Sequence, residues 1–241
     1  MLQDSLIQYI ELNVLQLSFH DLDELIIEEL NSNESYLPLF RYRRDTQAFQ
    51  INLTEQPLLH FVELEAAALF YGVPGQHYFN HLVKTNPVYR LTQCSAFSEA
   101  YAQYLLRLSG SEPVYQQHHA VISQQEWLIS LLALALADLE LHVIGVEQAT
   151  VLDTLSSRAI ASRARLQFEL EQLTRQPGQA FISAAIAREL IQIQQTTALR
   201  LGSSFRLVNY LDRLNQVISL PLPLIREKMT LWTNDHDRAG D

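Results

Sequence analysis

One pair of histidines has the spacing to share a helix face and bind a metal ion. His77 and His81 lie four residues apart, so with Glu99 they could bind a metal ion. The general base expected between two such histidines is absent, and a coincidental helical pair is the preferred interpretation. Asp138 and His142 are a second candidate pair. They form either a hydrogen-bonded pair on a buried helix or a remnant of a binding site.

Composition excludes several other functions. The chain has no G-x-S-x-G segment and no glycine-rich loop for phosphates. Its formal charge of −10 opposes general binding to nucleic acid, because phosphate backbones are also negative. The single cysteine, Cys94, cannot form an internal disulfide and fits a reducing, cytoplasmic compartment. No signal peptide is recognised at the N-terminus, which also favours a cytoplasmic protein.

Two segments resemble motifs of a bacterial family of zinc-peptidase-like proteins called domain of unknown function 885. Residues 70–77 read Phe-Tyr-Gly-Val-Pro-Gly-Gln-His and resemble its H-E-x-x-P-G-H-H segment. Residues 98–104 resemble its E-G-W-A-x-Y segment, and residues 49–53, 138–142, 177–180 and 221–232 resemble further motifs in the family's order. Members of the family are usually longer, and the resemblance is to their C-terminal part.

The resemblance implies that the metal site is degenerate. Phe70 stands at a metal-binding histidine, Tyr71 at the catalytic glutamate and Gln76 at the first histidine after Pro-Gly. A catalytic zinc needs about three protein ligands, and phenylalanine has no lone pair to offer. Tyrosine is a poor base at neutral pH, since its reference pKa is about 10. Glu99 and His77 remain at ligand positions, but two ligands do not make a tight zinc site.

We therefore expect a non-catalytic pseudo-enzyme that binds or assembles and holds no metal or other cofactor. Its expected pocket would be lined by His77, Glu99, Tyr101, Asp138, His142 and Gln179. One alternative is a divergent metal-dependent peptidase or hydrolase that holds zinc at His77, His81 and Glu99. Another is a structural assembly subunit without a pocket.

Partner interactions are expected to be with protein. The resemblance implies that one wall of the family's cleft is missing, which would expose apolar surface unless the chain self-associates or meets a partner subunit. Nucleic acid and membrane partners are not expected. The most apolar run, residues 127–137, is about half the length needed to cross a bilayer, so it is predicted to be a buried core helix.

The fold class predicted is mainly α: a compact, zincin-like, multi-helix domain over residues 1–233, followed by a polar, frayed tail over residues 234–241. At most one short β-strand is expected, over residues 48–53. Apolar spacing, caps and Gly or Pro breaks predict helices over residues 2–17, 21–30, 58–71, 76–84, 89–108, 123–143, 146–154, 158–173, 178–201, 204–216 and 222–232.

Overall fold

The computed structural model describes residues 22–30, 38–53, 61–85, 95–111, 118–158 and 160–239. The described chain is mainly α-helical, which confirms the predicted class. The α-helices are α2 (Phe61–Tyr71), α3 (Gln76–Thr85), α4 (Ser95–Ser111), α5 (His118–Leu139), α6 (Gln148–Ser157), α7 (Arg163–Leu173), α8 (Gln179–Leu201), α9 (Leu207–Val217) and α10 (Leu222–Ala239). A π-helical turn, Glu140–Ile144, extends α5, and a 3-10 turn, Gly202–Ser204, follows α8.

A small sheet accompanies the helices. Strand β3 (Ala48–Ile51) lies in the middle, with β1 (Ile26–Glu29) parallel to it on one side and β2 (Phe40–Arg43) antiparallel on the other. The strand expected at residues 48–53 is confirmed. The expectation of at most one strand was wrong, because the sheet has three. The helix predicted over residues 21–30 was also wrong, because residues 26–29 form β1. Hydrogen bonding to β3, a partner distant in sequence, overrides the local helical tendency of that acidic segment.

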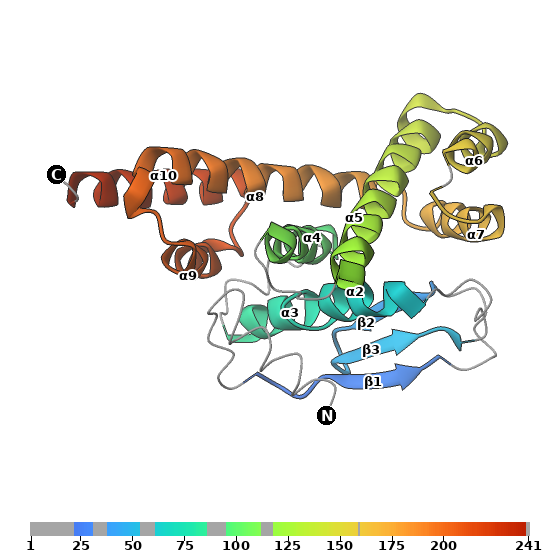
Figure 1. Cartoon of the computed structure of the whole chain (residues 1–241), viewed down its shortest axis with the longest axis horizontal. Helices are drawn as coiled ribbons and strands as arrows, with labels where there is room; N and C mark the ends of the chain where they lie inside the picture. Colours follow the sequence, from blue (N-terminus) through green and yellow to red (C-terminus); the bar gives the residue numbers. More distant parts are fainter. Residues whose placement is uncertain are drawn as a thin grey trace.

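The helices are stacked above this sheet (Figure 1). Going up the view, α2 and α3 lie next to the strands, α4 lies above them, and α8 and α10 run along the top. Helix α5 rises from the level of α2, and α6 and α7 lie beside its far end. Contacts between α4 and α8, α5 and α8, and α2 and α5 hold this arrangement together.

Among the residues that the structure describes, two groups of buried side chains form the interior. The larger group joins the sheet to α2, α3, α4, α5, α8, α9 and α10 and includes the fully buried Tyr101, Tyr104 and Tyr210. The smaller group joins the far half of α5 to α6 and α7 through residues such as Ala137, Val151 and Leu170. Burying apolar surface of this kind is the main favourable term in folding.

Helix α5, predicted to be a buried core helix, is buried on one face only. Trp127, Ala133 and Ala137 are buried. Ile129 and Leu132 on the opposite face are about half exposed, at 56% and 50%. By length and composition alone, the helical stretch Ile122–Ile144 could cross a bilayer. Of its most apolar 18 residues, 28% are buried within the protein.

Most described helix ends agree with the sequence expectations to within about three residues, but α5 begins at His118 rather than residue 123 and α7 at Arg163 rather than residue 158. Helix α10 continues to Ala239, so most of the expected frayed tail is helical. The turn between α2 and α3 requires glycine at Gly75, where a Cβ would lie 1.9 Å from the carbonyl oxygen of Phe70. The predicted helix at residues 2–17 and Cys94 lie outside the described residues. The division into one domain and a tail stays a prediction.

Candidate functional site

Phe70 lies inside an aromatic cluster at the end of α2. Its side chain is 2% exposed. Its ring centroid is 4.9 Å from that of Tyr71 and 6.0 Å from that of Trp127 on α5. The position that the resemblance assigns to a metal-binding histidine is therefore occupied by apolar packing.

Tyr71, the next residue, is held between the sheet and α5. Its ring stacks on Phe49 of β3 at 5.5 Å and meets Trp127 edge to face at 6.3 Å. Burial raises the pKa of the Tyr71 hydroxyl far above its ordinary value, and the nearby negative charges of Glu99 and Glu169 add to the rise. A hydroxyl in this setting stays protonated and does not act as a base.

His77 points toward the sheet, where both of its ring nitrogens have hydrogen-bond partners. Nε2 lies 2.7 Å from the carbonyl oxygen of Asp23, so Nε2–H donates. Nδ1 then accepts from the hydroxyl of Tyr42 on β2, at 3.0 Å. Burial lowers the pKa of His77, which keeps the ring neutral. Gln76, the replaced position before it, is also buried.

The chemistry of these donors does not fit a zinc ion. Phe70 has no lone pair, and the two nitrogens of His77 are engaged by β2 and by Asp23. His77, His81 and Glu99 do not come together: within the described ranges, no three His, Cys, Asp or Glu side chains are placed to hold a metal. The displaced metal site therefore has no geometric support.

Glu99 joins α4 to α8 instead. Its Oε1 accepts a hydrogen bond from Gln179 Nε2 at 2.5 Å, and its Oε2 accepts from Ser183 Oγ at 3.0 Å. Gln179 in turn accepts from the hydroxyl of Ser95 at 2.9 Å. Burial raises the pKa of Glu99, and these two donors partly oppose the rise. Both carboxylate oxygens are thus used within the protein.

Asp138 anchors the start of α8. Its fully buried carboxylate accepts from the backbone N–H of Gly178 at 2.8 Å and of Phe181 at 3.1 Å. The acceptor satisfies backbone donors that no helical carbonyl can reach, and its charge complements the helix dipole. His142 Nδ1 lies 2.7 Å from the same carboxylate. The geometry agrees with the interpretation of Asp138 and His142 as a hydrogen-bonded pair.

Tyr101 lies in the core rather than at a pocket. It is 0% exposed, and its ring lies 5.4 Å from that of Phe79. Its hydroxyl donates to Asn215 on α9 at 2.6 Å, and Asn215 donates to the hydroxyl of Tyr78 at 3.1 Å. The expected pocket residues therefore divide among separate places: His77 at the sheet, Tyr101 in the core, and Asp138 at the start of α8.

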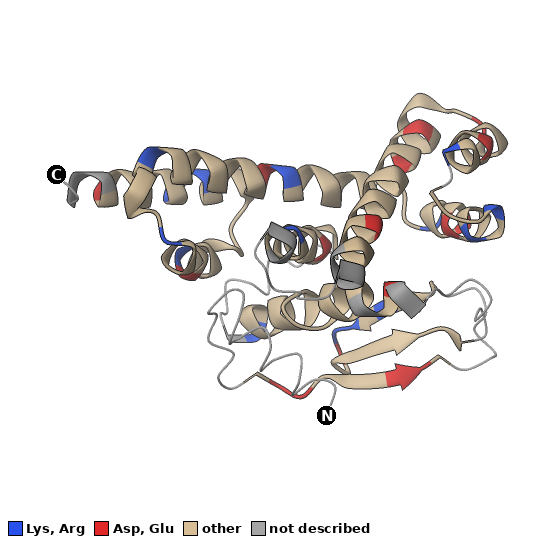
Figure 2. Ribbon diagram, in the orientation of Figure 1, with Lys and Arg blue, Asp and Glu red and all other residues tan. Residues whose placement is uncertain are grey.

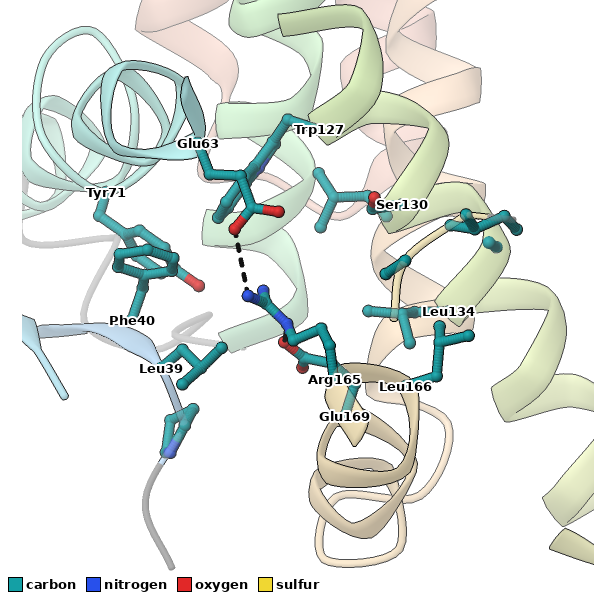
Figure 3. A pocket seen from close by; sticks show the side chains of 15 residues that line it. Leu39, Phe40, Glu63, Tyr71, Trp127, Ser130, Leu134, Arg165, Leu166 and Glu169 are labelled. Atoms are coloured by element: carbon teal, nitrogen blue, oxygen red, sulfur yellow. Dashed lines mark hydrogen bonds and ion pairs between the residues drawn. The ribbon is translucent and has the colours of Figure 1, made fainter. Parts of the chain in front are cut away.

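A cavity of about 140 Å³ lies elsewhere, between β2, α2, α5 and α7 (Figure 3). Tyr71 is the one altered motif residue that lines it. Its walls are mostly apolar and aromatic, and its charged members are Glu63, Arg165 and Glu169; the remaining lining residues are Pro38, Leu39, Phe40, Trp127, Ser130, Leu131, Ala133, Leu134, Ile160, Ala161 and Leu166.

Arg165 links the two carboxylates at this cavity. Its Nη1 lies 3.1 Å from Glu63 Oε2 on α2, and its Nε donates to Glu169 Oε1 at 2.7 Å. The three side chains are 10–21% exposed, so the cluster is largely buried but still meets solvent. Burial raises the pKa of Glu169, and Arg165 opposes the rise. The four-residue spacing of Arg165 and Glu169 is visible in the sequence. The contact between Arg165 and Glu63 spans 102 positions and is not.

The protein is mainly helical, and its motif-bearing regions lie on neighbouring helices. Tyr71 ends α2, Glu99 lies on α4 and Gln179 begins α8, and α4 contacts both of the other helices. The chain belongs to the family of bacterial proteins of unknown function DUF885, whose sequence profile matches residues 38–229. This match establishes the family that the motifs indicated.

One solved structure shows the same fold. It is described as "the putative lipoprotein from Colwellia psychrerythraea", and it superposes with a TM-score of 0.80 at 14% sequence identity. The alignment covers 97% of this chain and 43% of the other. The chain therefore spans less than half the length of that relative. No curated protein matches the chain significantly.

Proposed function

We propose that this chain is a non-catalytic member of its family that binds a small ligand in the cavity beside Tyr71. The observation that carries the proposal is the packing of Phe70, which is 2% exposed between Tyr71 and Trp127. Restoring a metal ligand there would require a polar group in an apolar cluster, which is costly without a partner.

The remaining polar groups support the same conclusion. A zinc hydrolase needs ligands with free lone pairs, a water position and a base beside it. Here the carboxylate of Glu99 accepts from Gln179 and Ser183. Tyr71 at the base position holds its proton because burial raises its pKa.

The cavity supports binding. Ligand sites in proteins are concave, mainly apolar and supplied with a few convergent polar groups. The space beside Tyr71 has this composition, with Arg165 and its two carboxylate partners against aromatic walls.

Metal content together with peptide hydrolysis tests the non-catalytic part. Protein dialysed against zinc and then against metal-free buffer is expected to retain no stoichiometric zinc and to leave a mixed peptide pool uncut. About one zinc per chain, lost in Glu99→Ala but kept in Glu171→Ala, would overturn the proposal. Glu171 is a suitable control because it is an exposed glutamate on α7.

Assembly is a second candidate function. The outer face of α5, defined here as Ile122, Ile129, Leu132 and Leu136, is 50–56% exposed at every position. Most of α5 is uncharged, whereas α7 carries both signs of charge (Figure 2). Contiguous exposed apolar side chains mark interaction surfaces. We propose that a second copy of the chain or a partner subunit covers this face.

A further inference from the structure

We infer that the cavity between β2, α2, α5 and α7 takes a small organic cation: a primary ammonium on a compact aromatic body. The inference rests on the proposed binding function and names the class of ligand. The size of the cavity and its charge both point to this class.

The size of the cavity sets the body of the ligand. Its volume is about 140 Å³. An apolar protein cavity of about 150 Å³ is known to hold benzene, so a single ring with short substituents is the right scale. Phe40, Tyr71 and Trp127 supply aromatic walls, with the rings of Phe40 and Trp127 5.6 Å apart. Leu134 and Leu166 line the other side, as Figure 3 shows.

The charged side chains at the cavity favour a positively charged ligand. Glu63 and Glu169 both contact Arg165, so the cluster has two carboxylates for one guanidinium. Arg165 already donates to both partners. An anionic ligand would have to displace Glu63 or Glu169 from Arg165. An ammonium group would instead balance the second negative charge, which Arg165 alone leaves uncompensated. The neighbouring ring faces also attract a cation.

Three ligands of nearly equal shape test the inference by calorimetric titration of the full chain. They are 4-hydroxybenzylamine, 4-hydroxybenzyl alcohol and 4-hydroxybenzoate, which differ mainly in the charge of one substituent. We expect the amine to bind about tenfold more tightly than the alcohol, which corresponds to about 1.4 kcal/mol of charge-dependent contact. We expect the benzoate to bind more weakly than either.

A variant locates the effect. Glu169→Gln removes the excess negative charge and leaves the Arg165–Glu63 pair in place. It should reduce amine affinity about tenfold and leave alcohol affinity unchanged. Glu171→Gln makes the same change on the same helix at an exposed position and should alter neither affinity. The comparison of the three ligands on the unaltered chain stands even if Glu169→Gln folds poorly.

The outcomes separate this inference from the proposed function. Equal affinity for amine and alcohol, or tighter binding of the benzoate, would overturn the choice of a cation while leaving a ligand-binding cavity. No binding of any of the three at millimolar concentration would overturn the inference as a whole. Zinc retention with peptide hydrolysis would instead overturn the proposed function, whatever the three ligands do.

Discussion

The side-chain amide of Gln179 donates a hydrogen bond to the carboxylate of Glu99, at 2.5 Å, across 80 positions of sequence. The contact joins the middle of the chain to the Pro-Gly-Gln-Ala segment that begins α8. Ser183, one turn further along α8, donates to the other oxygen of Glu99. A carboxylate at a metal-ligand position of the family thus serves here to connect two helices.

This role predicts a pH dependence for Glu99→Gln. Burial raises the pKa of Glu99, so the folded chain holds this proton more tightly than the unfolded chain does. Its contribution to the free energy of unfolding is therefore largest below the unfolded pKa and falls as pH rises through the folded pKa. A glutamine does not titrate, so the variant should gain stability relative to the parent as pH rises above the unfolded pKa of glutamate, about 4.3.

Urea unfolding of both proteins at several pH values measures this difference. Glu171→Gln provides the control, since it removes a carboxylate that remains exposed on α7. A difference between Glu99→Gln and the parent that stays constant with pH, or declines as pH rises, would contradict the assigned burial of Glu99.

Phe70→Ala tests whether the replaced metal position belongs to the core. The ring is 2% exposed and contacts Tyr71 and Trp127, so its removal should lower the free energy of unfolding by about 3–5 kcal/mol. Phe181→Ala is the matched control, because Phe181 is 39% exposed at the start of α8. Losses of similar size in the two variants would show that Phe70 faces an open site.

Asp138→Asn tests the anchor of α8. The change replaces one acceptor oxygen by a donor that cannot bond the N–H groups of Gly178 and Phe181. We expect a loss of about 1.5–3 kcal/mol, as for hydrogen bonds to charged groups. Asp153→Asn should cost less than about 1 kcal/mol, since its ion pair with Arg163 lies at the surface. Thermal unfolding followed by circular dichroism compares the two, and equal losses would refute the anchoring role.

The outer face of α5 predicts self-association. The parent should exceed the monomer mass of 27.6 kDa in light scattering at tens of micromolar, and Leu132→Gln with Leu136→Gln should return it to a monomer. Leu199→Gln is the control, because Leu199 lies on α8, away from this face, and is 85% exposed.

Two outcomes would count against that prediction. A parent that stays monomeric over the whole concentration range would remove the second copy as the occupant of the outer face of α5. Flotation of the parent with lipid vesicles, lost in the double variant, would assign the face to a membrane instead.

Local sequence determined most of the helices. Apolar spacing and Gly or Pro breaks predicted α2 to α10 to within a few residues at most ends, because a helix depends on contacts within one or two turns. The motif residues were also accessible from sequence: Phe70 carries no metal-binding atom in any fold. A pair between Asp138 and His142 on one helix was also expected from sequence, and His142 Nδ1 lies 2.7 Å from Asp138 Oδ1.

Tertiary structure alone decided the sheet and the cavity. The segment Ile26–Glu29 becomes a strand because β3 supplies backbone partners some 22 positions away, which outweighs its weak local preference. Glu63 meets Arg165 across 102 positions, and Tyr71 meets Trp127 between two helices. Such contacts depend on how the helices pack, so no periodicity within one helix could place the cavity or show that Glu99 is already bound by Gln179.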